Sequence, residues 1–291
     1  MEYNGHILRH EQKYLITYHD YRALRATLEK LMPRDEHCPV DGYFIRSLYF
    51  DDALSGAYRE KDAGVRRRRK HRLRIYDLSA KFAKYEVKDK FDSYISKTSS
   101  PITRDQAEKL IDGCFDGMLC PKEADCIEAG CFDAVTYDEE LQRMKCIKTA
   151  AERADCKKRK SIVIARNLGF IDARTKLLRP KVIVDYEREA FVCKEGNVRV
   201  TFDKHIRAGI SSFDIFDPNV PTVPAIEDDR LVLEVKYDEY LPVYIAQMMR
   251  QLSRWQTTQS KYIMCVDAKN TYYRKDVPYG SFQAPSDSGC S

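Results

Sequence analysis

The feature that most constrains the fold is a charged tripeptide, Glu-x-Lys, that recurs in three stretches of alternating residues. The three pairs are Glu11 and Lys13 in HEQKYLI, Glu86 and Lys88 in KYEVKDK, and Glu234 and Lys236 in LVLEVKY. Successive side chains of a strand point to opposite faces, so each pair predicts a strand with one apolar and one charged face.

The charged faces of other predicted strands carry arginines. They are Arg72 and Arg74 in RLRIYD, Arg188 in KVIVDYEREAF and Arg199 in NVRVTFD. In an open sheet these side chains would form an ordinary solvated face. The charged face, however, mixes Arg and Lys with Glu. In addition, too few helices are predicted to cover the apolar faces of an open sheet. We therefore favour a sheet that closes on itself with the charged face inward, so that its lumen is a polar tunnel.

The order of the predicted elements indicates an antiparallel arrangement. Strands are expected at residues 10–18, 43–52, 66–77, 84–90, 181–191, 197–204 and 230–237, and weakly at 161–174. Helices are expected after Asp20, after Thr103 and after Pro242, and residues 259–266 form a last short strand or helix. Because no βαβ alternation appears, the predicted fold class is α+β: an antiparallel β-barrel, or tunnel, of about eight strands with flanking helices.

Composition restricts the class of protein without identifying its function. The chain has 291 residues, 43% of them hydrophobic, and a formal net charge of +5, which does not by itself identify a nucleic-acid binder. No apolar run approaches the ~18–20 residues needed to span a bilayer, and no secretory signal opens the chain. We therefore expect a soluble, cytoplasmic protein. The cysteines lack CxxC spacing, which argues for reduced thiols and against zinc or disulfides.

Most of the chain is expected to form one domain. We assign residues 1–271 to the tunnel domain, with a helical, cysteine-containing insertion at about 114–160. Residues 272–291, which are rich in Pro, Gly and Ser, are expected to be a disordered tail.

The inward-facing charges predict a phosphate-handling site. A cation excess in an enclosed space is costly unless an anion neutralises it. Arginine binds phosphate oxygens bidentately, and lysine acts as a point charge. Carboxylates such as Glu234 suit Mg²⁺ or Mn²⁺, which bridges phosphate oxygens. Since neither GxxxxGK[ST] nor GxGxxG occurs, side chains and not a helix N-terminus would hold a nucleotide.

At these residues the sequence resembles the VTC domain, the polyphosphate polymerase branch of the triphosphate tunnel metalloenzymes, which are related to the CYTH enzymes. The motifs occur in order along about residues 6–113 and 161–266. They are HEQKYLI, SLYFDD, R-x-K-x-R-x-R-x-Y at residues 68–76, YEVKDK, YISKTS, RPKVIVDYEREAF, NVRVTFD, LVLEVKY and QSKY. Each motif alone is a weak signal, but nine in register are a strong one.

The resemblance implies a metal-dependent enzyme that extends polyphosphate with the terminal phosphoryl group of ATP. The predicted catalytic residues are Lys13, Arg72, Arg74, Lys88, Arg188 and Arg199. The predicted phosphate-binding residues are Lys70, Lys97, Lys236 and Lys261. The candidate metal ligands are Glu234, Glu11 and Glu86, with Mn²⁺ favoured over Mg²⁺. The expected ligands are ATP and polyphosphate, with no specific nucleic acid; a membrane-associated partner protein is an open alternative.

The sequence departs from its relatives in three places. The hydrolytic members carry ExExK on the first strand, but Arg9 stands at the first Glu position before Glu11 and Lys13. This weakens metal binding at the first strand and favours the polymerase branch. The insertion has no counterpart, and this chain carries neither the membrane segments nor the amino-terminal regulatory domain of eukaryotic members.

Several alternatives stay open at this stage. On the same scaffold, water could replace the chain end as acceptor, giving a tripolyphosphatase or nucleoside triphosphatase, and a third class is a non-catalytic polyphosphate or nucleic-acid binder. The VRRRRK run could be a nuclear-targeting or nucleic-acid patch. Asp203 could serve the site or pair structurally with Arg199. We interpret Tyr76 and Tyr186 as wall packing, and assign no role to His71 or His205.

Overall fold

The computed structural model describes residues 2–3, 6–7, 9–91, 94–114, 169–252 and 255–275, with side chains from residue 9 onward. Of the predicted cysteine-containing insertion, only Cys114 falls within these ranges, and the predicted tail is described only as far as Lys275. Within the described ranges, no helix has the length and apolar character needed to cross a membrane.

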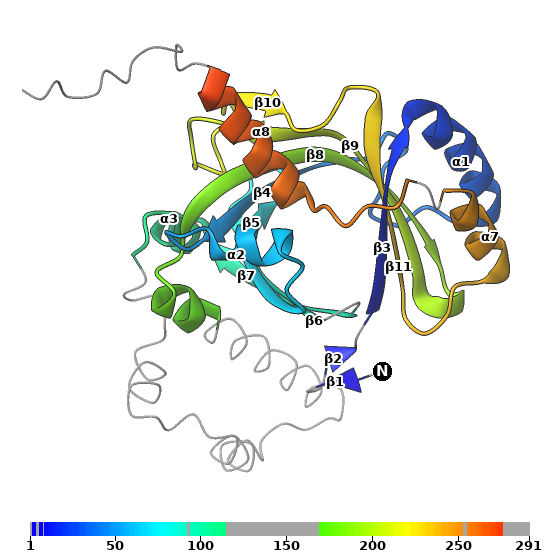
Figure 1. Ribbon diagram of the computed structural model, residues 1–291, viewed down its shortest axis with the longest axis horizontal. Helices are drawn as coiled ribbons and strands as arrows, with labels where there is room; N and C mark the ends of the chain where they lie inside the picture. Colours follow the sequence, from blue (N-terminus) through cyan, green and yellow to red (C-terminus); the bar gives the residue numbers. More distant parts are fainter. Residues whose placement is uncertain are drawn as a thin grey trace, which may run out of the picture.

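Nine strands form one antiparallel sheet in the order β10-β9-β11-β3-β7-β6-β5-β4-β8 (Figure 1). Because β8 pairs with β9 as well as with β4, eight of these strands close into a ring, and β10 extends from β9. The prediction of an α+β antiparallel barrel of about eight strands is confirmed. The strands are β3 (Arg9–Thr17), β4 (Tyr43–Asp51), β5 (Arg67–Ile75), β6 (Phe82–Phe91), β7 (Tyr94–Thr103), β8 (Arg179–Cys193), β9 (Val198–Gly209), β10 (Thr222–Pro224) and β11 (Arg230–Tyr237). A separate hairpin joins β1 (Glu2–Tyr3) to β2 (His6–Ile7).

Two of the helices begin at side-chain caps supplied by the sequence. The helices are α1 (Tyr18–Leu31), α2 (Gly56–Asp62), α3 (Arg104–Ile111), α7 (Val243–Gln251) and α8 (Lys261–Lys275), with a 3-10 turn η1 (Glu195–Asn197). Thr17 with Asp20 and Thr103 with Gln106 form the capping boxes of α1 and α3. In each box two backbone N–H groups without a helical partner are satisfied by side chains.

The apolar parity of the strands faces outward, where helices cover it. Helices α1 and α7 pack Leu28 and Ile245 on the outer residues of β3, β9 and β11, such as Leu233. Helix α3 and the helical segment 169–175 cover β5 and β6 in the same way. This outward core leaves the charged parity inside the ring, as the sequence predicts. Helix α8 crosses β8 and β9 and packs on a third apolar cluster (Figure 1).

Three features of the secondary structure differ from the expectation. The weak strand at 161–174 is wrong for residues 169–174, which are helical. Of the two alternatives for residues 259–266, the helix is correct from Lys261, where α8 begins. That helix continues to Lys275, four residues past the predicted start of the tail. Neither β7 nor the short β10 was predicted as a strand. Strand β7 pairs along its whole length with β6, and its other neighbour β3 meets it only at Arg9 and His10. Pro101 is therefore tolerated on an edge that needs no hydrogen-bond donor.

Candidate functional site

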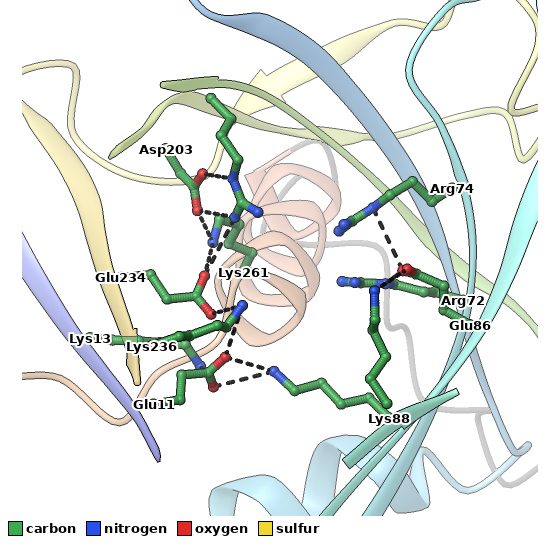
Figure 2. A network of polar contacts seen from close by, with 12 residues as sticks. Glu11, Lys13, Arg72, Arg74, Glu86, Lys88, Asp203, Glu234, Lys236 and Lys261 are labelled. Atoms are coloured by element: carbon green, nitrogen blue, oxygen red, sulfur yellow. Dashed lines mark hydrogen bonds and ion pairs between the residues drawn. The ribbon is translucent and has the colours of Figure 1, made fainter. Parts of the chain in front are cut away.

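The closed ring brings the inward-facing charges of its strands into one interior space. On one side, β5 presents Lys70, Arg72 and Arg74 opposite inward-facing residues of β6, including Glu86 and Lys88. On the other side lie inward-facing residues of β3, β11, β9 and β8, with Lys261 added by the first residue of α8. Figure 2 shows these two groups facing each other across the barrel interior.

Glu11 and Glu234 form the centre of the acidic group. The side chain of Glu11 is 3% exposed; Lys13 and Lys88 lie 2.9 Å from it and Lys236 lies 3.5 Å away. Glu234 is bound by Lys236 at 3.0 Å, and it also meets Lys261 and Arg188. Burial would raise the pKa of Glu234, but Lys236, Glu11 and Lys261 outweigh it and hold the pKa well below the usual value. Both buried carboxylates are therefore ionised at neutral pH.

Asp203 is the third carboxylate of this group. Arg188 donates two hydrogen bonds to it, at 2.6 and 2.8 Å, and Lys261 forms an ion pair with it. The alternative in which Asp203 pairs with Arg199 is wrong. Arg199 instead bonds Asp35 at 2.6 Å. The reason is register: Arg188 is the cross-strand neighbour of Asp203, whereas Arg199 lies four residues away on the same strand.

The arginine group across the interior is organised around a single carboxylate, Glu86. Arg72 Nε lies 2.6 Å from Glu86 and Lys97 Nζ lies 3.0 Å from it, while Arg74 is 3.8 Å away. The tyrosines Tyr49 and Tyr186 accept hydrogen bonds from Arg72 and Arg74 respectively, both at 2.9 Å. The guanidinium groups are thereby fixed in position, and one carboxylate cannot neutralise three cations.

Lys70 shows most clearly that cations exceed carboxylates in the interior. Its Nζ contacts Ser260 Oγ at 3.1 Å and lies 4.5 Å from the centre of the Tyr262 ring. Among the described residues, no carboxylate lies within ion-pair distance of it. Burial first, and then Lys13 and Lys88, hold the pKa of Lys70 well below its usual value. Lys70 therefore has no anionic partner within the described part of the chain.

Lys88 shows the same imbalance although it has a partner. Burial lowers its pKa to about 7, because the attraction of Glu11 does not compensate for burial and for repulsion by Lys13 and Lys236.

Helix α2 places a cation near the interior that the sequence reasoning missed. Burial lowers the pKa of Lys61 to about 8, and repulsion by Arg68, Lys13 and Lys90 contributes. Lys61 therefore lies close to the cations of β3, β5 and β6. No signal in the sequence could have found it, because a residue on a short helix has no place in the alternation of the strands.

Two predicted residues lie at the rim and not in the centre. The side chain of Lys97 is 49% exposed and that of Arg199 is 33% exposed. By contrast, the side chains of Lys261 and Arg188 are each 10% exposed. All the predicted site residues thus line or border one interior, but they differ in how far solvent reaches them.

The predicted metal ligands separate into two places. Glu11 and Glu234 lie together, while Glu86 is held by Arg72 and Lys97 on the opposite side. Within the described ranges, no three His, Cys, Asp or Glu side chains gather as a metal-binding group. The two adjacent ionised carboxylates, which Lys236 bridges, nevertheless fit Mg²⁺ or Mn²⁺, since such ions take their other ligands from water and phosphate. Glu11 and Glu234 are the residues that would hold it.

Comparison with known proteins identifies the family. The sequence model of the VTC domain matches residues 8–269. No curated protein sequence matches the chain.

Solved structures with a similar fold include a putative adenylate cyclase from Bacillus halodurans, at 11% identity and a TM-score of 0.44, covering 88% of this chain and 95% of that one. The PH1819 protein of Pyrococcus horikoshii has 9% identity and a TM-score of 0.40, covering 89% and 98%. A putative adenylate cyclase from Vibrio parahaemolyticus has 9% identity and a TM-score of 0.39, covering 89% and 98%. None of these scores reaches 0.5, and the family assignment rests on the sequence match.

The match extends over most of the chain and includes every motif on which the resemblance was based. It agrees with a closed antiparallel ring whose interior is lined by Arg, Lys and Glu. This chain therefore belongs to the VTC domain family.

Proposed function

We propose that the chain is a metal-dependent polyphosphate polymerase that transfers the terminal phosphoryl group of ATP to a polyphosphate chain inside the barrel. The observation that supports this most strongly is the cation excess of the interior. The carboxylates there are Glu11, Glu86, Asp203 and Glu234. The cations are Lys13, Lys70, Arg72, Arg74, Lys88, Lys97, Arg188, Lys236 and Lys261. A polyanion supplies the charge that the carboxylates do not.

Fixed donors are what phosphoryl transfer requires from a protein. Phosphoryl transfer requires little covalent chemistry from the enzyme. Positioning and charge stabilisation therefore account for most of the rate enhancement. Arg72 and Arg74 are anchored by Glu86 and by tyrosine hydroxyls, and Arg188 is anchored by Asp203. Their guanidinium N–H groups are thus oriented before the substrate arrives, which avoids reorganisation during the reaction.

The lysines provide a second region for phosphate. Lys70 and Lys88 lie next to each other in the β5–β6 pair and lack sufficient negative charge nearby. We assign the acceptor end of the polyphosphate chain to this region and the triphosphate of ATP to the arginine group. The two phosphate-binding regions would then meet within one interior. Glu234 and Glu11 would hold Mn²⁺ or Mg²⁺, which would supply positive charge to offset that of the phosphates.

Arg9 supports the polymerase over a hydrolase on the same scaffold. Its guanidinium bonds Asp238 at 2.7 Å and the backbone oxygen of Asn197. Strand β3 thus provides the carboxylate of Glu11 but none at position 9. The hydrolytic relatives carry ExExK on the corresponding strand. Tripolyphosphatase activity and non-catalytic polyphosphate binding are the alternative outcomes of the test below. A cytoplasmic location and the lack of a nucleic-acid partner stay predictions.

The test is incubation of the purified chain with ATP and Mn²⁺, with the products resolved on a polyacrylamide gel. A ladder of long phosphate chains, lost in an Arg72→Ala control, is the expected result. Free phosphate without chains would mean a hydrolase, and unchanged ATP with measurable polyphosphate binding would mean a binding protein. Either result would overturn the polymerase assignment.

A further inference from the structure

An exposed tyrosine lies at the rim of the interior, directly after strand β5. Tyr76 follows Arg74 by two residues and is 41% exposed, so the interpretation of this ring as wall packing is wrong. Its ring centre lies 6.0 Å from that of Tyr43, the first residue of β4, with the planes 48° apart. The Nζ of Lys84 lies 5.0 Å from the centre of the Tyr76 ring.

This aromatic pair is connected to the phosphate-binding arginines on both sides. Burial acts to raise the pKa of the Tyr76 hydroxyl, but the neighbouring Arg74 lowers it. Arg74 also donates a hydrogen bond of 2.9 Å to Tyr186 deeper in the interior. Tyr43 accepts a hydrogen bond of 3.4 Å from Arg199. If the phosphates of a ligand contact Arg74, the part of the ligand that extends toward this rim lies against the rings of Tyr76 and Tyr43.

Tyr76 is the accessible member of the tyrosines that contact the interior arginines. Tyr186 is buried, and Tyr43 and Tyr49 are half-buried. Tyr262, beside Lys70, is 1% exposed and unavailable for stacking. Lys84 is exposed and, within the described part of the chain, has no carboxylate in ion-pair distance, so its flexible side chain can leave the ring without breaking a salt bridge.

We propose that Tyr76, supported by Tyr43, is the stacking platform for the nucleobase of the nucleoside triphosphate. This inference rests on the proposed function, because it assumes that the triphosphate binds to the arginine group. Every base has a π-face, so stacking tolerates any base and alone reads no hydrogen-bonding edge. The platform therefore predicts that ATP and GTP bind with similar affinity. It also gives the triphosphate a direction, with the base at the Tyr76 rim and the terminal phosphate inward.

The experiment compares a ligand that has a base with one that lacks it. Calorimetry would measure the dissociation constants of the β,γ-imido analogue of ATP and of tripolyphosphate, at one fixed Mn²⁺ concentration. Loss of one stacked base is worth on the order of a tenfold change in dissociation constant. Tyr76→Ala should weaken the nucleotide by about that factor and leave tripolyphosphate within about twofold. Tyr76→Phe, which keeps the ring, should bind both like the wild type.

The outcomes separate this inference from the function on which it rests. Tyr272→Ala on α8 removes a comparably exposed tyrosine (37%) and should change neither ligand. If Tyr76→Ala leaves nucleotide binding unchanged, or weakens both ligands equally, the platform is refuted while the phosphate site stands. If wild-type protein binds no tripolyphosphate, the phosphate site itself is refuted, and the platform with it.

Discussion

Arg188 and Glu189 are neighbours in strand β8, yet they belong to two different buried charge networks. Arg188 points into the barrel and binds Asp203 and Glu234. Glu189 points outward, with its side chain 2% exposed, toward helix α1. There it accepts hydrogen bonds from Tyr21, Arg25, Arg34 and Lys204, which we call the Glu189 cluster.

The two networks differ in whether their charges are satisfied. In the Glu189 cluster, hydrogen bonds from Lys204, Tyr21 and Arg25 overcome burial and lower the pKa of Glu189 to about 2. The pKa of Arg25 rises, chiefly through its hydrogen bond to that carboxylate. In the interior, Lys88 and Lys70 have lowered pKa values because burial and neighbouring cations prevail. In the outer network a second carboxylate, Glu29, also pairs with Arg25 and Arg34. In the inner network, on the proposed function, an anion would supply the missing negative charge.

The largest expected effect distinguishes the two networks by activity. Glu234→Gln should reduce metal-dependent ATP turnover by about a hundredfold or more, because it removes the charge that would hold the cation. The matched outer variant, Glu189→Gln, should keep turnover per folded molecule within about twofold of wild type. Initial rates normalised to folded protein, from circular dichroism, provide the measurement. Equal losses of turnover in both variants, or unchanged turnover in Glu234→Gln, would contradict the distinction between the interior and the Glu189 cluster.

A second effect, of comparable size in free energy, is expected in the stability of the outer network. Glu189→Gln should lower the free energy of unfolding by about 3 kcal/mol at pH 7, because it leaves buried cations without their carboxylate. The pKa of Glu189 is about 2 when folded, against an ordinary value of 4.5. Its stabilisation is therefore complete above about pH 5 and is lost as the pH falls from 4.5 toward 2. Urea unfolding should show a smaller difference between wild type and variant at pH 3 than at pH 7; a difference that grows would contradict this account.

The smallest expected effect concerns the rim of the interior. Lys97 is half exposed, so solvent and salt screen its charge, and Lys97→Met should reduce turnover only several-fold. Arg72→Ala, at a buried position, should cost about a hundredfold. The ratio of the two losses measures how far enclosure strengthens the phosphate contacts. Similar losses for both variants would show that depth in the barrel does not matter.

The fold class could be predicted from the parity of the strands, together with the element order and the small number of predicted helices. The alternation in LVLEVKY, KYEVKDK and RLRIYD assigns an apolar face to the helices and a charged face to the interior, and the ring has that arrangement. Strand β7 was missed because YISKTSSPIT lacks alternation and contains proline. Its pairing with β6, and not its own sequence preference, makes it a strand.

Which charges would pair could not be read from the sequence. Parity places Asp203, Arg188 and Arg199 on one face, but only the register of β8 against β9 decides that Asp203 meets Arg188. Lys61 lies near the interior on a short helix, and Ser260 contacts Lys70 from the position before α8, so both lie outside any strand pattern. Contacts of this kind depend on tertiary arrangement and leave no periodic signal.

A crystal structure with tripolyphosphate tests most directly whether the interior cations bind a polyanion. We predict phosphate groups within hydrogen-bonding distance of Arg72, Arg74 and Arg188, on the inside of the ring. Phosphate bound only on the outer face of β5, at Arg67 or Arg69, with none inside at a saturating concentration, would contradict the account.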